Sequence, residues 1–205
     1  MDRATVPTRW WHRVDADRVQ CDVCPRHCTL RPGQHGLCFV RASDGDGVVL
    51  RTYGRSSGFC VDPIEKKPLN HVLPGSATFS FGTAGCNLAC RFCQNWDISK
   101  SRETDTLADA ASPEQIARAA VATGCRSVAF TYNDPTVFME YAMDVADACR
   151  EAGLVTVAVT AGYIEPDPRA ELFAHLDAAN VDLKGFSEAF YRQVCGAELG
   201  AVLDT

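Results

Sequence analysis

Three cysteines near the middle of the chain have the spacing C-x3-C-x2-C, at Cys86, Cys90 and Cys93. They follow residues 77–83, which predict a β-strand, so the three thiols share one tight loop at its C-terminal end. In α/β folds that end of a strand is where ligands bind. Iron–sulfur clusters are normally held by four cysteines. Three leave one iron free to bind another ligand, so the triplet predicts a [4Fe–4S] cluster with an open coordination site.

Two other interpretations of the triplet remain open at this point. Zinc accepts Cys₄ and Cys₃His sites, and Cys60 or His71 would then supply the fourth ligand. The cysteines could also be packed structural residues. The spacing, with the aromatic Phe92 directly before the last cysteine, favours the cluster.

Four more cysteines form a second group near the N-terminus, in the order Cys21, Cys24, Cys28 and Cys38. Two close cysteines followed by two more are typical of a small four-ligand metal site. A structural zinc ion would supply folding energy to a segment with little regular structure. An auxiliary iron–sulfur cluster is the competing hypothesis, and the spacing does not separate the two.

Cysteine is the unusual feature of the composition, with 11 in 205 residues. Disulfides are rare in a reducing cytosol, so metal or redox roles are favoured. Residues 1–20 lack the apolar core of a signal peptide, and no apolar run is long enough to span a membrane, which predicts a cytoplasmic protein. The net charge of −6 argues against nucleic-acid binding. Cys60, Cys125 and Cys149 are expected to be small core residues, and the role of Cys195 stays open.

The elements that position these cysteines change character near residue 76. Residues 1–75 look irregular apart from a hairpin with strands at 37–41 and 48–53. From residue 76 onward strands and helices alternate, which predicts parallel βα units. The expected strands are residues 77–83, 127–132, 155–160 and 180–184. The expected helices run from Pro113 to Gly124, from Pro135 to Gly153, from Pro168 to Leu176 and from just after Ser187 to near Gly196.

About four βα units cannot close a TIM barrel, because the full type has eight strands. We therefore expect an α/β fold with two parts: a cysteine-rich segment at 1–75 and a partial TIM-type barrel at 76–205, incomplete at its C-terminus. Helix start signals support the assignment. Ser112 and Gln115 form a capping box before the first helix, and Asp134 precedes Pro135 at the second. The second helix carries an apolar stripe at helical spacing, made of Phe138, Tyr141, Ala142, Val145 and Cys149.

The segment CNLACRFC at residues 86–93 resembles the cluster motif of the radical S-adenosylmethionine (SAM) superfamily. The resemblance implies that the open iron binds SAM, and that Phe92 lies near its adenine. The flanking residues 61–76 and 82–86 are similar to the radical SAM enzyme of the AmmeMemoRadiSam system, a relative of the pyruvate formate-lyase activating enzymes. The likeness begins at about Cys21 and includes the N-terminal pattern CxxCPxxCxLxxGxxGxC.

The resemblance also assigns SAM-binding roles to residues at the ends of three later strands. Asn133 and Asp134 occupy the place of a motif that contacts the SAM amine, although Asp134 is one methylene shorter than the usual Glu and could simply cap a helix. Thr160 begins a similar segment in which Ala161 replaces the usual Asn. Asp182 and Lys184 end the fourth strand, where the Lys of relatives approaches the SAM carboxylate. No catalytic side chain on the substrate side can be assigned.

The reaction implied is reductive cleavage of SAM to a 5′-deoxyadenosyl radical that abstracts hydrogen from an unknown substrate. It needs a reductant such as flavodoxin or ferredoxin, and family association adds Memo-like and AMMECR-like proteins as partners. A glycyl-radical enzyme activase is one alternative. A non-catalytic metal-binding or electron-transfer module is another, and an incomplete copy that binds a cluster without turnover, with weak SAM binding, is a third.

Overall fold

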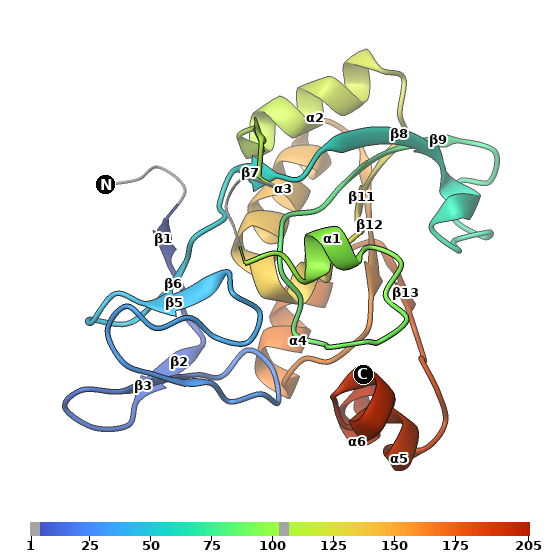
Figure 1. The fold of residues 1–205 in the computed structure, drawn as a ribbon. Helices are drawn as coiled ribbons and strands as arrows, with labels where there is room; N and C mark the ends of the chain where they lie inside the picture. The colour runs from blue at the N-terminus through green and yellow to red at the C-terminus, as the bar shows by residue number, and fades with distance from the viewer. Residues whose placement is uncertain (1–4, 103–106) are drawn as a thin grey trace.

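A five-stranded sheet forms the centre of the fold in the computed structural model, which describes residues 5–102 and 107–205 (Figure 1). The strand order is β13-β12-β11-β9-β8. Four strands run parallel, and β8 pairs antiparallel with β9 at one edge. The strands are β8 (Phe59–Pro63), β9 (Ala77–Phe81), β11 (Ser127–Phe130), β12 (Val155–Thr160) and β13 (Ala178–Val181).

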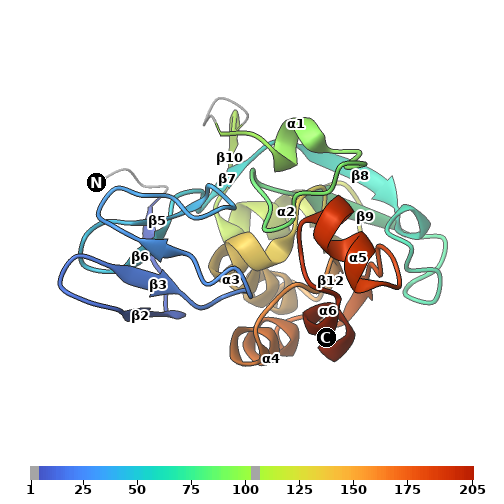
Figure 2. The ribbon, with the colours of Figure 1, turned by 60° about the horizontal axis from the view of Figure 1, so that its bottom comes forward.

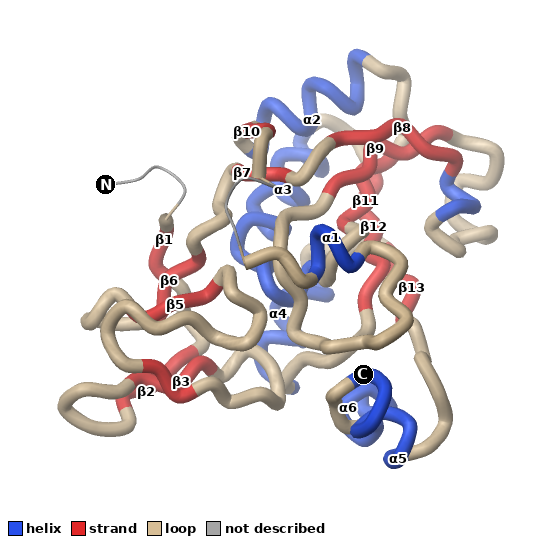
Figure 3. Tube along the Cα trace, in the orientation of Figure 1, coloured by secondary structure: helices blue, strands red, loops and turns tan. Residues whose placement is uncertain are grey.

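Three helices lie side by side along one face of this sheet (Figure 3). They are α2 (Pro113–Ala122), α3 (Met139–Glu151) and α4 (Pro166–Ala174), with the short 3₁₀ turn η3 (Pro135–Phe138) leading into α3. The capping box expected at Ser112 is present, with both of its hydrogen bonds to Gln115. The predicted stripe on α3 is completely buried against β9 and β11, because its residues repeat at the helical period.

The opposite face of the sheet is covered in part by the turn after β8, which includes η1 (Ile64–Lys66). Ile64 and Leu69 pack there on Ala129 and Val157 of the central strands. Since β11 and β12 are buried on both faces, most of their residues are apolar, as expected for parallel strands. The predicted series of parallel βα units is thus confirmed as a mixed α/β fold, and the edge strand β8 is an addition that the sequence did not indicate.

The N-terminal part contains more regular structure than the sequence indicated (Figure 2). It folds as two small three-stranded antiparallel sheets and a strand pair, and the predicted hairpin is present as β5–β6. The elements are β1 (Val6–Pro7), β2 (Trp11–Arg13), β3 (Val19–Cys21), β4 (Thr29–Leu30), β5 (Arg41–Ser43), β6 (Val48–Leu50), and β7 (Arg55–Ser56) paired with β10 (Asp109–Ala110). The predicted boundary between residues 75 and 76 stays a prediction, and β8 pairs with β9 across it.

Several sequence-based assignments need correction. The strand expected at 180–184 lies at β13 instead, so Asp182 and Lys184 belong to the loop after it. The first hairpin strand begins at Arg41 rather than Leu37, because residues 37–40 turn back on themselves to place Cys38. Cys60 is exposed on the edge strand β8, so its expected burial is wrong, whereas Cys125 and Cys149 are buried as expected.

The last described elements are short and stand beyond the C-terminal ends of the strands (Figure 2). They are α5 (Glu188–Phe190), the π-helical turn η4 (Tyr191–Cys195) and α6 (Leu199–Asp204), and the short helix α1 (Trp96–Ser99) follows the cysteine triplet. Ser187 caps α5 and left-handed Gly196 ends η4, both as predicted. No helix within the described residues is long and apolar enough to cross a membrane.

Candidate functional site

The cysteine triplet lies on the loop that leaves β9 at its C-terminal end. Two glycines before Cys86 allow the loop to pass close to its neighbours. A Cβ on Gly82 would come within 2.3 Å of the Thr131 carbonyl oxygen, and one on Gly85 within 1.9 Å of the Cys38 carbonyl oxygen. Gly85 also has a φ of +76°, which disfavours any side chain. Both positions therefore require glycine.

Asn133 holds the start of this loop with its whole amide group. Its Oδ1 accepts from the Thr83 N–H at 2.9 Å, and its Nδ2 donates to the carbonyl oxygens of Ala84 and Gly85 at 3.1 and 3.0 Å. Because Asn133 is buried, water could not take over its hydrogen bonds to these backbone groups if the side chain were removed. The side chain that the resemblance assigned to SAM binding thus positions the cysteine loop.

The far side of the loop is held by the turn η4. Ala89 N–H donates to the Cys195 carbonyl oxygen at 2.8 Å, and Arg91 N–H to that of Val194 at 2.9 Å. Inside the loop, Asn87 Nδ2 donates to the Tyr163 carbonyl oxygen at 2.7 Å. The backbone that carries the three thiols is therefore held by Asn133 after β11, by Tyr163 after β12 and by the turn η4. These contacts preorganise the loop for a ligand.

The turn that carries Asn133 depends on a strained residue. Tyr132 has a φ of +71°, and its hydroxyl donates to the Asp62 carboxylate at 2.9 Å. Asp62 also accepts from buried Lys67 at 2.7 Å and from Lys66 at 2.9 Å. Burial alone would raise the pKa of Asp62, but these hydrogen bonds hold it well below its usual range. The Glu65-Lys66-Lys67 segment, which the sequence alone would read as a solvated turn, therefore anchors the edge of the site through Lys67.

The three thiols differ in their surroundings. Burial raises the pKa of Cys86, and the charge of Asp134 adds to the effect. Burial also raises the pKa of Cys90, opposed by a hydrogen bond from the Cys195 thiol and by the charge of Lys184. Cys93 Sγ lies 3.1 Å from Ser99 Oγ. Three thiols on one loop with a cation nearby form a soft donor set that suits iron.

Asp134 and Thr160 join the ends of β11 and β12. The Asp134 carboxylate accepts from Thr160 Oγ1 at 3.0 and 3.1 Å and from the Ala161 N–H at 2.8 Å. It also accepts from the Thr136 N–H at 3.0 Å, so it caps the following 3₁₀ turn as well. The helix-capping role is confirmed. Since the carboxylate is buried and fully hydrogen-bonded within the chain, its contact with a SAM amine stays a prediction.

Comparisons with known proteins agree with this geometry. The model of the family described as "Radical SAM superfamily" matches residues 81–202. The uncharacterized protein MJ0808 of Methanocaldococcus jannaschii is 37% identical over 196 residues, which cover 96% of this chain and 58% of that protein. The chain belongs to the radical SAM superfamily. It spans little more than half the length of this curated relative.

Solved structures with a similar chain path include Escherichia coli QueE, with a TM-score of 0.47 and 15% identity, covering 73% of this chain and 66% of QueE. A structure of TYW1 with a lysine-pyruvate adduct bound gives a TM-score of 0.44 and 13% identity, covering 71% of this chain and 58% of TYW1. Streptococcus suis SuiB bound to precursor peptide SuiA gives 0.44 and 19%, covering 58% and 26%. These likenesses are weak, and no argument below depends on them.

Membership in the radical SAM superfamily implies a [4Fe–4S] cluster and SAM as cofactors. The prediction of a radical SAM enzyme is therefore confirmed at the level of the superfamily. The individual ligand assignments to Cys86, Cys90 and Cys93 stay predictions, and the three thiols on one fixed loop fit such a cluster. Its bound SAM would lie over the C-terminal ends of the parallel strands, where Asp134 and Lys184 also lie.

Lys184 lies at this edge of the radical SAM fold although it is outside a strand. Its ammonium donates to Asp182 at 2.6 Å and is within electrostatic range of Cys90 and Asp134. Burial opposes its charge, but the Asp182 hydrogen bond raises the pKa of Lys184, so it is charged at neutral pH. Phe92 is half exposed, and its ring lies 6.1 Å from that of Phe190, measured between ring centroids.

Sequence reasoning missed two side chains that contact the triplet. Ser99 lies beside Cys93, and the buried Cys195 thiol lies beside Cys90. Ser99 gave no signal in the sequence, because it lies six residues after Cys93 on the short helix α1, which the sequence did not predict. Cys195 did give a signal, because it was the one cysteine outside the two groups to which the sequence analysis assigned no core position.

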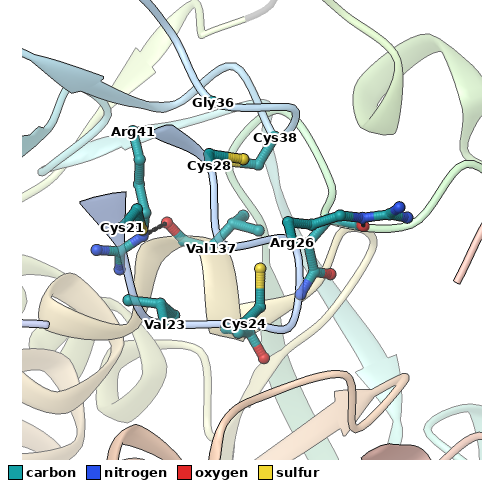
Figure 4. Close-up of a pocket in the computed structure, with 11 residues that line it drawn as sticks. Cys21, Val23, Cys24, Arg26, Cys28, Gly36, Cys38, Arg41 and Val137 are labelled. Carbon is teal, nitrogen blue, oxygen red and sulfur yellow. Dashed lines mark hydrogen bonds between the residues drawn. The ribbon is translucent and has the colours of Figure 1, made fainter. Parts of the chain in front are cut away.

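The N-terminal group is brought together as predicted. Cys21, Cys24, Cys28 and Cys38 line one cavity, between β3 and the turn before β5 (Figure 4). All eleven cysteines of the chain are free thiols. The metal that the sequence assigned to this group, zinc or an auxiliary cluster, stays a prediction.

Proposed function

We propose that the chain is the cluster-bearing core of a radical SAM enzyme of the AmmeMemoRadiSam type, with Cys86, Cys90 and Cys93 as the ligands of a [4Fe–4S] cluster. When bound, that cluster supplies the electron that cleaves SAM to a 5′-deoxyadenosyl radical, which abstracts hydrogen from a substrate. The observation that carries the proposal is the triplet loop, fixed at the strand edge by Asn133 and η4.

The charged groups around the loop support a SAM site. Lys184 provides a positive charge for the SAM carboxylate, and its pairing with Asp182 keeps it protonated. Asp134 provides a fixed negative charge for the SAM amine, and Thr160 orients its carboxylate. Exposed Phe92 is free to stack on the adenine ring.

An electron donor of the flavodoxin or ferredoxin class, a cytosolic location, and Memo-like and AMMECR-like partners belong to the same proposal. Eleven unpaired cysteines are compatible with a reducing compartment. A glycyl-radical enzyme activase is the version of this chemistry in which the substrate is a protein backbone glycine. It would be identified by radical formation on such a partner.

One observation favours a second candidate, an electron-transfer module. The Cys195 thiol lies within hydrogen-bonding reach of Cys90 and could serve as a fourth cluster ligand. A cluster with four protein ligands has no open iron for SAM. Cys195→Ala separates the two candidates, because a SAM-responsive cluster survives this change and a four-cysteine cluster does not.

The test is electron paramagnetic resonance (EPR) of the anaerobically reconstituted, dithionite-reduced protein with and without SAM. We expect a [4Fe–4S]⁺ signal that shifts on addition of SAM and disappears in Cys90→Ala. Cys60→Ala is the matched control, because Cys60 is an exposed thiol on the edge strand β8 and belongs to neither cysteine group. A signal that SAM does not change in any variant would refute the proposed SAM chemistry.

A further inference from the structure

The four N-terminal cysteines surround a built cavity that the proposed SAM chemistry does not use (Figure 4). The cavity has about 350 Å³ of empty space, open solvent included. Cys21 and Cys38 are buried at its inner side, and Cys24 and Cys28 are partly exposed. The four thiols, one of them at the end of β3, line this cavity without forming a disulfide.

One of the four sulfurs accepts a backbone hydrogen bond, as thiolates that bind a metal commonly do. Leu37 N–H donates to Cys28 Sγ at 3.4 Å. Such a donor stabilises negative charge on sulfur.

A buried cation completes the electrostatics of the cavity. Arg41 is 2% exposed, lines the cavity and lies within electrostatic range of Cys21 and Cys38. Its guanidinium pairs with Glu140 at 3.0 and 2.5 Å. One positive charge beside four thiolates reduces the net negative charge that a bound metal centre would leave in the core.

Four cysteines are a donor set that both zinc and a [4Fe–4S] cluster accept. The position of the group favours the cluster, because a redox centre beside the triplet loop can exchange electrons with the cluster that the family implies there.

The second group also adjoins the first. The Cys38 carbonyl oxygen packs directly on Gly85, and Cys38 and Cys86 both line a second cavity, of about 330 Å³ with open solvent included. Arg26, between two cysteines of the second group, donates to the carbonyl oxygen of Asn87 at 2.8 Å. Asn87 itself lines the cavity of the second group.

We propose that Cys21, Cys24, Cys28 and Cys38 ligate a second iron–sulfur cluster of the [4Fe–4S] class, which passes electrons to the cluster on the neighbouring loop. The second cluster takes one electron from a ferredoxin or flavodoxin at its exposed side, next to Cys24 and Cys28. It returns to its oxidised state when it passes that electron, on the side of Cys38, to the cluster on the triplet loop. The site itself stands on the cavity alone, whereas the relay role rests on the proposed function.

The test isolates each group in the full chain. A variant with Cys86, Cys90 and Cys93 all changed to Ala keeps only the second group. After anaerobic reconstitution it is expected to hold about four irons and four sulfides per chain. Its reduced EPR signal should not respond to SAM. Zinc without iron and sulfide, or no metal at all, in this variant would overturn the proposal.

The complementary variant is Cys24→Ala with Cys28→Ala, and Cys60→Ala is again the control. It should lose the SAM-insensitive signal and about half of the iron, and keep the SAM-responsive signal. In stopped-flow reduction by flavodoxin it should also lose the fast phase in which the first cluster is reduced, and an unchanged fast phase would refute the relay. If this variant does not fold, the triple variant still decides whether the cluster exists. A wild-type signal that never responds to SAM, with the triple variant still binding iron, would refute the proposed function and leave the second site standing.

Discussion

Replacing Asn133 with Ala should detach the start of the cysteine loop from the end of β11. The change leaves the Thr83 N–H and the carbonyl oxygens of Ala84 and Gly85 without their partner, at a buried position. A buried polar group without a partner costs about 1–3 kcal/mol. Three such groups with partial relaxation give a loss of roughly 3–5 kcal/mol in the free energy of unfolding. That is a large share of the stability of a typical domain, about 5–15 kcal/mol.

The assay is urea unfolding of the anaerobic metal-free protein, followed by circular dichroism, with iron content after reconstitution as a second readout. Asn180→Ala is the control, because its side chain makes one partly exposed hydrogen bond, to Asp182 at 2.6 Å. It should cost about 1 kcal/mol or less. Asn133→Asp keeps the acceptor for Thr83 but turns an oxygen toward two carbonyls, so it should be as damaging as Ala. If Asn133→Ala and Asn180→Ala cost the same and retain the same iron, the amide does not hold the loop.

Three other changes test separate parts of the fold. Glu140→Gln leaves the buried Arg41 guanidinium without its counter-charge and should cost about 3 kcal/mol in urea unfolding. Burial raises the pKa of Cys149 to about 12, so the unfolded chain loses this proton first and stability should fall as pH rises above about 9. Cys149→Ala should make the stability less dependent on pH in that range. Ser112→Ala removes the capping box with Gln115 and should cost about 1 kcal/mol.

Each of these has a comparison that decides it. For Glu140, the matched change is Asp15→Asn in the exposed pair with Arg18, which is expected to change the free energy of unfolding far less, because solvent screens that pair. Equal losses would mean that the buried pair is no more important than the surface pair. For Cys149, equal pH slopes in the two proteins between pH 9 and 11 would remove the thiol as the cause. For Ser112, a loss near zero would show that the cap is redundant.

The sequence predicted the parts of the fold that follow from local rules. The cap at Ser112, the stripe on α3 and the strand Val155–Thr160 were all placed correctly, because turn chemistry and periodicity act within one element. The antiparallel pairing of β8 with β9 was not predicted. It depends on a partner strand and on the anchoring of Lys67 by Asp62, which no local pattern encodes.

The candidate site divides in the same way. The cysteine triplet carries its own signal in its spacing, and the four N-terminal cysteines do too. The role of Asn133 in holding the loop could not be predicted, since its three backbone partners lie about fifty residues away. The contact of Cys195 with Cys90 depends on η4, a turn whose π-helical geometry has no signature in the sequence.

The close approach of Cys38 to Gly85 limits how this chain can be divided or recombined. A chimera that takes its first 75 residues from a relative must bring a compatible turn at residues 36–41, or the graft will push against the triplet loop. We therefore expect that the cysteine-rich segment cannot be exchanged without regard to the triplet loop. A chimera of two homologues should fold only when residues 36–41 and 82–87 come from the same parent. The two stretches are distant in the sequence but pack against each other as one unit.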